Sequence, residues 1–247
     1  MYKGLTTDAH SASKGLSQVN RLYRKIKKQF KWLIYCDVDE FIATKKNFDL
    51  TIRSQLKQID SLKVNIKQIF VPWVLMSGKK LKNNPKSVLK EVLYRHDHDK
   101  RHPIPFPFKK NPRSRRKFRC RKRLIEGKSI LKPKYWRSLR DHHPILPNRN
   151  ASPRAITVNS ISLRHDGRIV GKTGSAKFLK LRNKDIENGF FVCYHYRYIS
   201  EAHSRSKLKT NGWYEADGYS FGVLKATTYP EIYDDTMLKK VSCSGEK

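Results

Sequence analysis

The chain has 247 residues, which is enough for one large domain or two small ones with a hydrophobic core. Hydrophobic residues make up 38% of the sequence and aromatic residues 11%, which excludes a wholly disordered chain. Lys and Arg number 54 against 21 Asp and Glu, a formal net charge of +33, so the classes of function to consider include those with polyanionic partners.

The first third of the chain is predicted to alternate helices and strands. Residues 1–16 are polar and indicate a flexible N-terminus. Ser17 is a plausible N-cap for an amphipathic helix with a basic face, and the apolar run 32–36 predicts a strand that is buried on both faces. A helix over about 50–62 and a strand over 66–74 follow. This alternation predicts an α/β fold.

Three carboxylates come directly after the run 32–36, at Asp37, Asp39 and Glu40. In open α/β sheets, ligands bind beyond the carboxyl ends of the strands. Two Asp side chains two positions apart point the same way if the chain stays extended, and together they can hold one divalent cation. Alternatively, Asp37 and Asp39 cap a following turn, because Asp is common in turns. The residues alone leave both interpretations open.

A basic segment divides the chain. Residues 109–123 carry ten Lys or Arg and no acid, and they follow a stretch interrupted by prolines. Like charges repel one another, so we expect residues 97–123 to form an exposed insertion. In one interpretation the run 109–123 binds an anionic membrane surface, nucleic acid or another polyanion. In the other it only reflects the basic composition of the whole chain.

A second buried strand is expected over 189–194, with His195 at its end. Ser200 can cap a helix that runs to Lys209, and the N-terminus of such a helix can bind an anion. Aromatic and acidic residues then follow without a spacing that singles out one of them.

Three motifs carry a resemblance to a known family. The sequence W-L-x-x-x-D-V-D-E-F at Trp32–Phe41 is similar to the D-V-D-E-F segment of the family-2-like and family-92-like glycosyltransferases, which have the GT-A fold. His195-Tyr196 with Ser200-Glu201 resembles the H-Y-x-x-x-S-x-E module of that family. A third segment, K-S-I-x-x-P at Lys128–Pro133 followed by a histidine, also resembles the family.

This resemblance implies a GT-A-like (Rossmann-like) mixed sheet flanked by helices. It implies transfer of a sugar from a nucleotide-diphosphate donor to a glycan or other hydroxyl acceptor, with Mn²⁺ or Mg²⁺ as cofactor. The residues implied are Asp37, Asp39 and His195 for the metal, Lys207 and Lys128 for the donor diphosphate, and Trp73 and Trp213 for the acceptor. For the catalytic base, Asp217, Glu215 and His143 are considered and none is assigned.

The chain departs from the family pattern ahead of the first motif. In the family, a longer segment with the first strands and the nucleotide-base pocket precedes D-V-D-E-F, whereas 36 residues precede Asp37 here. We therefore expect an N-terminally truncated domain. Its predicted parts are a flexible N-terminus (1–16), a partial core (17–96), the insertion (97–123), an acceptor-side half (124–225) and a C-terminal tail (226–247).

Two other classes of function stay open at this point. One is a nucleic-acid- or polyanion-binding protein, and the other is an inactive remnant of a transferase. The four cysteines are widely spaced and contain no C-x-x-C pair, and no stretch approaches the ~20 apolar residues of a membrane span. We therefore expect a cytoplasmic protein.

Overall fold

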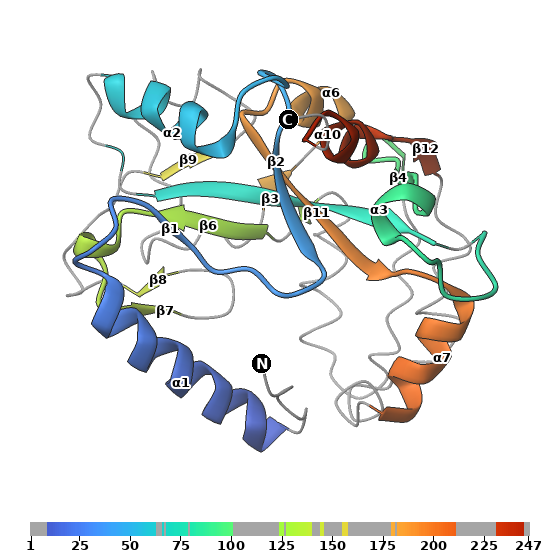
Figure 1. Ribbon diagram of the computed structural model, residues 1–247, viewed down its shortest axis with the longest axis horizontal. Helices are drawn as coiled ribbons and strands as arrows, with labels where there is room; N and C mark the ends of the chain where they lie inside the picture. Colours follow the sequence, from blue (N-terminus) through green and yellow to red (C-terminus); the bar gives the residue numbers. More distant parts are fainter. Residues whose placement is uncertain are drawn as a thin grey trace. The chain divides into compact units, whose positions relative to one another are not determined.

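A computed structural model describes most of the chain (Figure 1). The described residues are 9–62, 66, 68–78, 80–100, 124–125, 127–139, 144–145, 155–157, 179–180, 182–210 and 231–244. The chain forms two compact units, which are described separately below. We call residues 13–73 and 124–194 the D-x-D unit, and residues 1–12, 74–123 and 195–247 the C-terminal unit.

The D-x-D unit is built on a mixed sheet. Its strands follow the order β1 (Leu33–Ile34), β6 (Gly127–Leu131), β3 (Gln68–Ser77), β11 (Phe191–Tyr198) and β2 (Glu40–Thr44), and β3 and β11 run on into the C-terminal unit. β6 pairs antiparallel with β1 and with β3, whereas β9 (Ala155–Thr157) pairs parallel with β3. The predicted α/β class and mixed sheet are confirmed.

Helices and short strands complete the D-x-D unit. Those described are α1 (Ala9–Ile26, whose first four residues belong to the C-terminal unit), α2 (Ile52–Ser61), the 3-10 turn η1 (Pro133–Tyr135), α6 (Asn183–Glu187), and the two-residue pairs β5 (Leu124–Ile125) with β10 (Leu179–Lys180) and β7 (Ser138–Leu139) with β8 (Pro144–Ile145). The predicted helix 50–62 is confirmed as α2, and Thr51 is its N-cap because its side chain accepts a hydrogen bond from the Ser54 N–H (3.1 Å).

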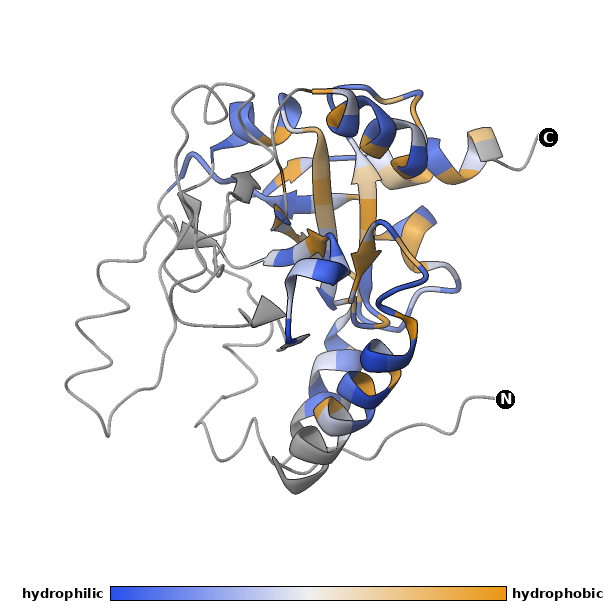
Figure 2. Ribbon diagram, turned by 90° about the vertical axis from the view of Figure 1, so that its left-hand side faces the viewer, coloured by the Kyte–Doolittle hydropathy of each residue, from blue (hydrophilic) through white to orange (hydrophobic). Residues whose placement is uncertain are grey.

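The first helix begins earlier than predicted. α1 starts at Ala9, so Ser17 lies inside the helix and is not its N-cap, and only residues 1–8 of the expected flexible N-terminus lie outside the described residues. The stretch from residue 9 to residue 16 contains no proline, and Ala, Leu and Lys favour helix, so nothing in it stops the helix. The ribbon of α1 is mostly hydrophilic with a few hydrophobic positions (Figure 2).

One buried tyrosine attaches α1 to the unit. The Tyr23 side chain is 1% exposed and lies in an apolar cluster with Leu131, Trp136 and Leu139. Its hydroxyl donates a hydrogen bond to the Pro133 carbonyl oxygen (2.8 Å), and burial raises the pKa of Tyr23 to about 12, so this donor stays protonated. Tyr23 is therefore an apolar position of α1 that attaches this helix to the D-x-D unit.

Strand β3 extends beyond the predicted end and contains Pro72 in its interior, not near its end as predicted. A proline cannot donate to a sheet hydrogen bond, so its position needs a reason. Pro72 is opposite Gly127, the first residue of β6, and the β3–β6 pairing ends there. Further along, Met76 of β3 pairs with Arg95 of another strand. The proline therefore occupies the point where β3 loses one neighbour.

Gly127 allows β6 to approach β3 closely at that point. A Cβ atom at Gly127 would collide with the Val71 carbonyl oxygen and would lie 2.8 Å from both the Phe70 ring and the Pro72 Cα. Backbone atoms make up most of this contact, so the neighbours cannot move aside as a flexible side chain would. Only glycine fits this position.

A charged network ties α2 to the rest of the unit. The Asp60 carboxylate accepts a hydrogen bond from the Trp32 indole N–H (2.9 Å) and forms ion pairs with Lys31 (2.9 Å) and Lys132 (2.7 Å). Burial on its own would raise the pKa of Asp60, but hydrogen bonds from Lys132, Trp32 and Lys31 outweigh it and lower the pKa. The network thus favours the charged carboxylate.

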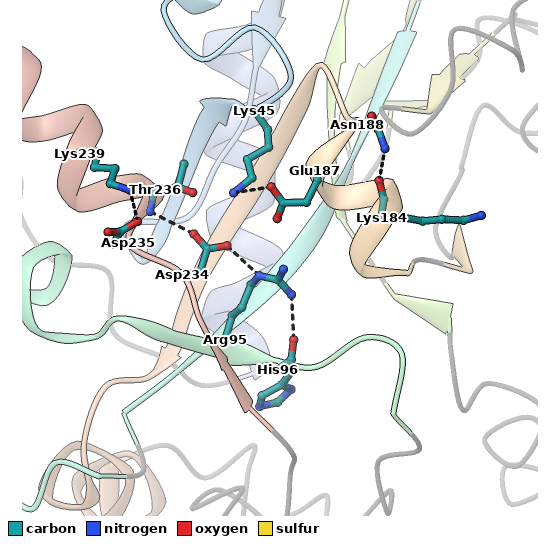
Figure 3. Close-up of polar contacts among 10 residues, drawn as sticks. All are labelled: Lys45, Arg95, His96, Lys184, Glu187, Asn188, Asp234, Asp235, Thr236 and Lys239. Carbon is teal, nitrogen blue, oxygen red and sulfur yellow. Dashed lines mark hydrogen bonds and ion pairs between the residues drawn. The ribbon is translucent and has the colours of Figure 1, made fainter.

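Contacts at β2 hold it to the chain ahead of β11. The backbone N–H groups of Lys45 and Lys46 donate to the carbonyl oxygens of Phe190 and Gly189. The Lys45 ammonium also forms an ion pair with Glu187 at 3.1 Å (Figure 3). The C-terminal end of β2 is therefore fixed to the segment before β11.

The C-terminal unit contains the second halves of β3 and β11, together with α3 (Val88–Glu91), β4 (Tyr94–His96), α7 (Glu201–Thr210), β12 (Glu231–Tyr233) and α10 (Thr236–Ser244). β4 pairs antiparallel with β3 and with β12. The segment predicted as a C-terminal tail thus includes a strand and a helix. The basic run 109–123 lies outside the described residues, and the predicted domain boundaries stay predictions.

A buried ion pair anchors this C-terminal segment. Arg95 Nε lies 2.7 Å from Asp234 Oδ2, and both side chains are 3% exposed. The other carboxylate oxygen of Asp234 accepts the N–H of Thr236, where α10 begins (Figure 3). Asp234 therefore joins β4 to the start of α10.

Replacement of Gly127 by Ala is expected to destabilise the protein by about 1–3 kcal/mol, because the added methyl collides with the backbone of β3. Gly15→Ala is the matched control, since nothing lies within 4 Å of a Cβ atom there and alanine favours helix by about 0.5–1 kcal/mol. Free energies of unfolding from denaturant titration measure both. Equal effects of the two substitutions would contradict the close approach of β6 to β3.

Asp60→Asn is expected to lower the free energy of unfolding by about 1.5–3 kcal/mol at pH 7, because hydrogen bonds to a charged group are lost. A lowered folded pKa means that this contribution is present above the ordinary Asp pKa and is lost as the pH falls through the folded value. The difference between wild type and variant should therefore shrink below about pH 4. Asp49→Asn, at an exposed residue, serves as the control.

Candidate functional site

The three carboxylates after β1 lie in one tight turn of the D-x-D unit. The Glu40 N–H donates to the Asp37 carbonyl oxygen (3.1 Å), and the Asp37 N–H donates to the Glu40 carboxylate (2.9 Å). These reciprocal bonds close the turn from Asp37 to Glu40, with Val38 fully exposed at its tip. Glu40 therefore holds this turn closed.

Lys128 fixes the turn through two ion pairs. Its ammonium lies 2.8 Å from Asp37 Oδ2 and 3.2 Å from Glu40 Oε2. The side chains of Lys128 and Glu40 are 1% and 0% exposed, whereas that of Asp37 is 52% exposed. Burial on its own would lower the pKa of Lys128, but Asp37 and Glu40 outweigh it and raise the pKa. Lys128 therefore stays positively charged and holds one oxygen of each carboxylate.

This arrangement changes the role expected for Lys128. The sequence predicts a contact with the donor diphosphate, but a buried ammonium that already bonds two carboxylates is not presented to a ligand in this structure. Its position follows from the sheet: Lys128 is opposite Val71 in the β3–β6 register, and it is separated from Asp37 by 91 residues in sequence. No local sequence pattern predicts the pairing of Lys128 with Asp37.

The surroundings of Lys128 are largely apolar. Its ammonium lies 5.4 Å from the centroid of the Tyr35 ring. Burial, reinforced by Glu40, raises the pKa of Cys36 to about 12 and that of the fully buried Cys193 well above its usual value. Both cysteines are free thiols in the structure and stay protonated. Cys193 is buried, whereas Cys36 is only partly buried.

The strand before the turn differs from the prediction. β1 contains only Leu33 and Ile34, and Ile34 is 39% exposed, so the run 32–36 is not a strand buried on both faces. Among the described strands, β1 lies at the edge of the sheet and pairs only with β6, which explains the exposure. Asp37 and Asp39 therefore follow a short strand and lie within a turn, not along an extended chain.

The structure does not show Asp37 as the residue whose side chain caps this turn. Glu40, and not Asp37, supplies the carboxylate that accepts a backbone N–H within the turn. The Asp37 carboxylate uses Oδ2 for Lys128 and is half exposed, so its second oxygen is accessible. An oxygen donor of this kind suits a hard divalent cation such as Mn²⁺ or Mg²⁺, with Asp39 two residues away in the same turn. The residues present therefore fit such a cation.

No group of three or more His, Cys, Asp or Glu side chains that could hold a metal ion occurs among the described residues. His195 belongs to the C-terminal unit, is 6% exposed and lies inside β11, because this strand continues to Tyr198 and does not end at residue 194 as predicted. The Gly78 N–H donates to the Tyr198 carbonyl oxygen (2.7 Å), which extends the strand. The assignment of His195 as a metal ligand stays a prediction.

The N-terminus of α7 differs from the expected anion site. Ser200 is the N-cap as predicted, since its hydroxyl oxygen accepts the His203 N–H at 3.0 Å. The N–H groups of Glu201 and Ala202 donate to the carbonyl oxygens of Leu81 and Lys82. The first three N–H groups of the helix are therefore occupied by the chain itself, which leaves none of them for an anion.

The remaining predicted site residues are placed as follows. Lys207 donates to the Arg197 carbonyl oxygen (3.1 Å) and is partly buried. Trp73 is 7% exposed, which indicates packing rather than a ring presented to an acceptor sugar. Trp213, Glu215, Asp217 and His143 lie outside the described residues, and their roles stay predictions.

Comparison with known families identifies the domain. The sequence model of glycosyltransferase family 92 matches residues 19–211, which includes the D-V-D-E turn, Lys128 and the H-Y motif at His195. The chain belongs to glycosyltransferase family 92. A comparison with curated protein sequences finds no match. The suspected family is thus confirmed, and the mixed sheet with its flanking helices is consistent with the GT-A-like fold expected for it.

Family 92 membership places the chain among the transferases, a class that acts on a sugar donor and an acceptor. The match begins within α1 and ends directly after α7, so β12 and α10 lie beyond it. In the part of the chain that the structure describes, no helix is both long and apolar enough to pass through a membrane.

Lys128→Met is expected to lower the free energy of unfolding of this family 92 domain by about 3–5 kcal/mol, because the fully buried Glu40 carboxylate loses its cation. Lys134→Met, on an exposed lysine of the turn after β6, should change it by less than about 0.5 kcal/mol. Denaturant unfolding measures both. Equal stability of Lys128→Met and wild type would contradict the buried ion pairs.

Proposed function

We propose that the chain transfers a sugar from a nucleotide-diphosphate donor to a hydroxyl group of a glycan or other acceptor, with a divalent cation held by Asp37 and Asp39. The observation that supports this most is the Asp37 carboxylate, which is half exposed yet fixed by the buried Lys128. Membership of family 92 supplies the reaction class.

The residues of the turn prepare Asp37 for this role. Glu40 closes the turn and Lys128 holds one oxygen of Asp37, so the carboxylate is oriented before any ligand binds. Preorientation of a ligating group lowers the cost of binding, because less freedom is lost at that step. When bound there, Mn²⁺ or Mg²⁺ supplies a Lewis acid that neutralises charge on the leaving diphosphate.

The overall charge of the chain is suited to such a donor. A nucleotide diphosphate is strongly anionic, and a net charge of +33 attracts anions and raises their rate of encounter. The same charge also supports the second candidate function, binding of a polyanion such as nucleic acid or an anionic membrane surface. That candidate requires neither Asp37 nor Asp39, so the two functions make opposite predictions for these residues.

Titration calorimetry with Mn²⁺ alone and then with UDP- and GDP-sugars tests the proposal on wild type, Asp37→Asn and Asp39→Asn. We expect each substitution to weaken binding of Mn²⁺ and of the donor by about tenfold or more, since a charged ligand is replaced by a neutral one. Asp49→Asn removes an exposed carboxylate from the same unit and should bind as wild type does.

The other outcomes of these experiments also distinguish between the two candidate functions. Donor binding that is independent of Mn²⁺ and unchanged in both variants would contradict a cation at this turn. Binding of nucleic acid or anionic vesicles with a steep salt dependence, and without binding of any nucleotide sugar, would favour the polyanion-binding function. Thermal melting of each variant shows whether the loss of the Asp37–Lys128 pair has unfolded the protein.

A further inference from the structure

A cavity of the D-x-D unit lies between α1 and β7. It has a volume of about 530 Å³ and is lined by Asn20, Arg24, Arg137 and Ser138. None of these residues belongs to the turn at Asp37–Glu40, so the cavity is made by a different part of the unit and does not depend on the proposed function.

Asn20 fixes the two walls of this cavity to each other. Its side-chain amide donates to the Leu139 carbonyl oxygen (3.0 Å), and its Oδ1 atom accepts the Leu139 N–H (2.7 Å). The side chain of Asn20 thus pairs with one residue of β7 as a neighbouring strand would. α1 and β7 are therefore held at a defined separation.

Two further side chains, Tyr23 of α1 and Lys27 directly after the helix, strengthen this contact. The Tyr23 hydroxyl lies 3.2 Å from the Trp136 carbonyl oxygen, and the Lys27 ammonium lies 3.5 Å from the same oxygen. Positions 20, 23 and 27 have helical spacing, so their side chains lie on one side and all contact the segment that precedes and enters β7. The two walls of the cavity are therefore joined by several hydrogen bonds.

Each wall contributes one arginine. Arg24 lies one helical turn after Asn20, and Arg137 directly follows the anchored Trp136. Both arginines are exposed, and within the described part of the chain neither guanidinium forms an ion pair or a hydrogen bond. The hydroxyl of Ser138 likewise has no hydrogen-bond partner there. Two positive charges and a hydroxyl therefore line one cavity, and no described residue supplies a counter-ion.

We propose that this cavity is a binding site for a small organic phosphate or sulfate. Each guanidinium offers a planar fork of N–H donors that matches two oxygens of a tetrahedral oxyanion, and Ser138 offers a further donor. The volume lies within the 300–1,000 Å³ that is typical of small-molecule sites, and it exceeds what the anionic group alone needs. The occupant is therefore an anionic group attached to a body of about the size of a sugar ring.

The competing explanation is a general attraction of anions by a basic helix. α1 also carries Arg21 and Lys25, and Lys28 follows its end; these residues are exposed and do not line the cavity. Attraction by net charge affects all these residues alike and falls steeply with salt, whereas a built site depends on Arg24 and Arg137 in particular. The two explanations thus differ in whether binding depends on Arg24 and Arg137 more than on Arg21.

The test is titration calorimetry at physiological salt, in the presence of EDTA, with inorganic phosphate, glucose 6-phosphate and uncharged glucose as probes. We expect saturable binding of one glucose 6-phosphate per chain, weaker binding of inorganic phosphate and none of glucose. Arg24→Gln and Arg137→Gln should each weaken binding about tenfold or more, because charge-assisted hydrogen bonds are lost. Arg21→Gln, on the same helix, should bind within twofold of wild type.

A second pair of variants separates charge from geometry. Arg24→Lys and Arg137→Lys keep the charge but lose the planar fork, and we expect several-fold weaker binding with an unchanged melting temperature. Asp37→Asn/Asp39→Asn should bind glucose 6-phosphate as wild type does, which separates this site from the proposed donor site. Absence of saturable binding, or equal losses in Arg21→Gln and Arg24→Gln, would overturn the proposal.

Discussion

The buried ammonium of Lys128 is the interaction on which the candidate site depends. A charged group in the protein interior requires compensation, and here Asp37 and Glu40 supply it at 2.8 and 3.2 Å. The same two bonds fix the turn that follows β1. The register between β6 and β3 sets the position of Lys128, and Gly127 allows the strands to approach at that point. The site is therefore a consequence of how the sheet is packed.

The charges at this turn suit the capture of a further cation. Three carboxylates lie within four residues at Asp37, Asp39 and Glu40, and Lys128 brings one positive charge to them. The remaining negative charge is set in a chain of net charge +33. In the proposed function, the turn attracts the divalent cation locally, while the net charge of the protein attracts the anionic donor. The two attractions act on different ligands and do not oppose each other.

Local patterns in the sequence were sufficient for much of this picture. The α/β alternation predicts α2 and β3, and the motifs around Asp37 and His195 indicate the family. The predicted extent of β1 and the predicted start of α1 were wrong. The extent of β1 depends on its position at the edge of the sheet, and the start of α1 depends on a helical run without a stop signal. The pairing of Lys128 with Asp37 and that of Arg95 with Asp234 join residues far apart in sequence. Such contacts are set by strand register, which no short pattern reports.

The segment beyond the family match is joined to the C-terminal unit by the same kind of interaction. The match ends at residue 211, yet Asp234 neutralises Arg95, and both side chains are 3% exposed. A guanidinium buried to this degree depends on its carboxylate, because an uncompensated charge in the interior costs several kcal/mol, on the order of 3–5 when one partner is removed. β12 adds backbone pairing with β4 along three residues, from Tyr94 to His96. The folded C-terminal unit therefore extends past the boundary of the family match, and its last strand and helix are part of its structure.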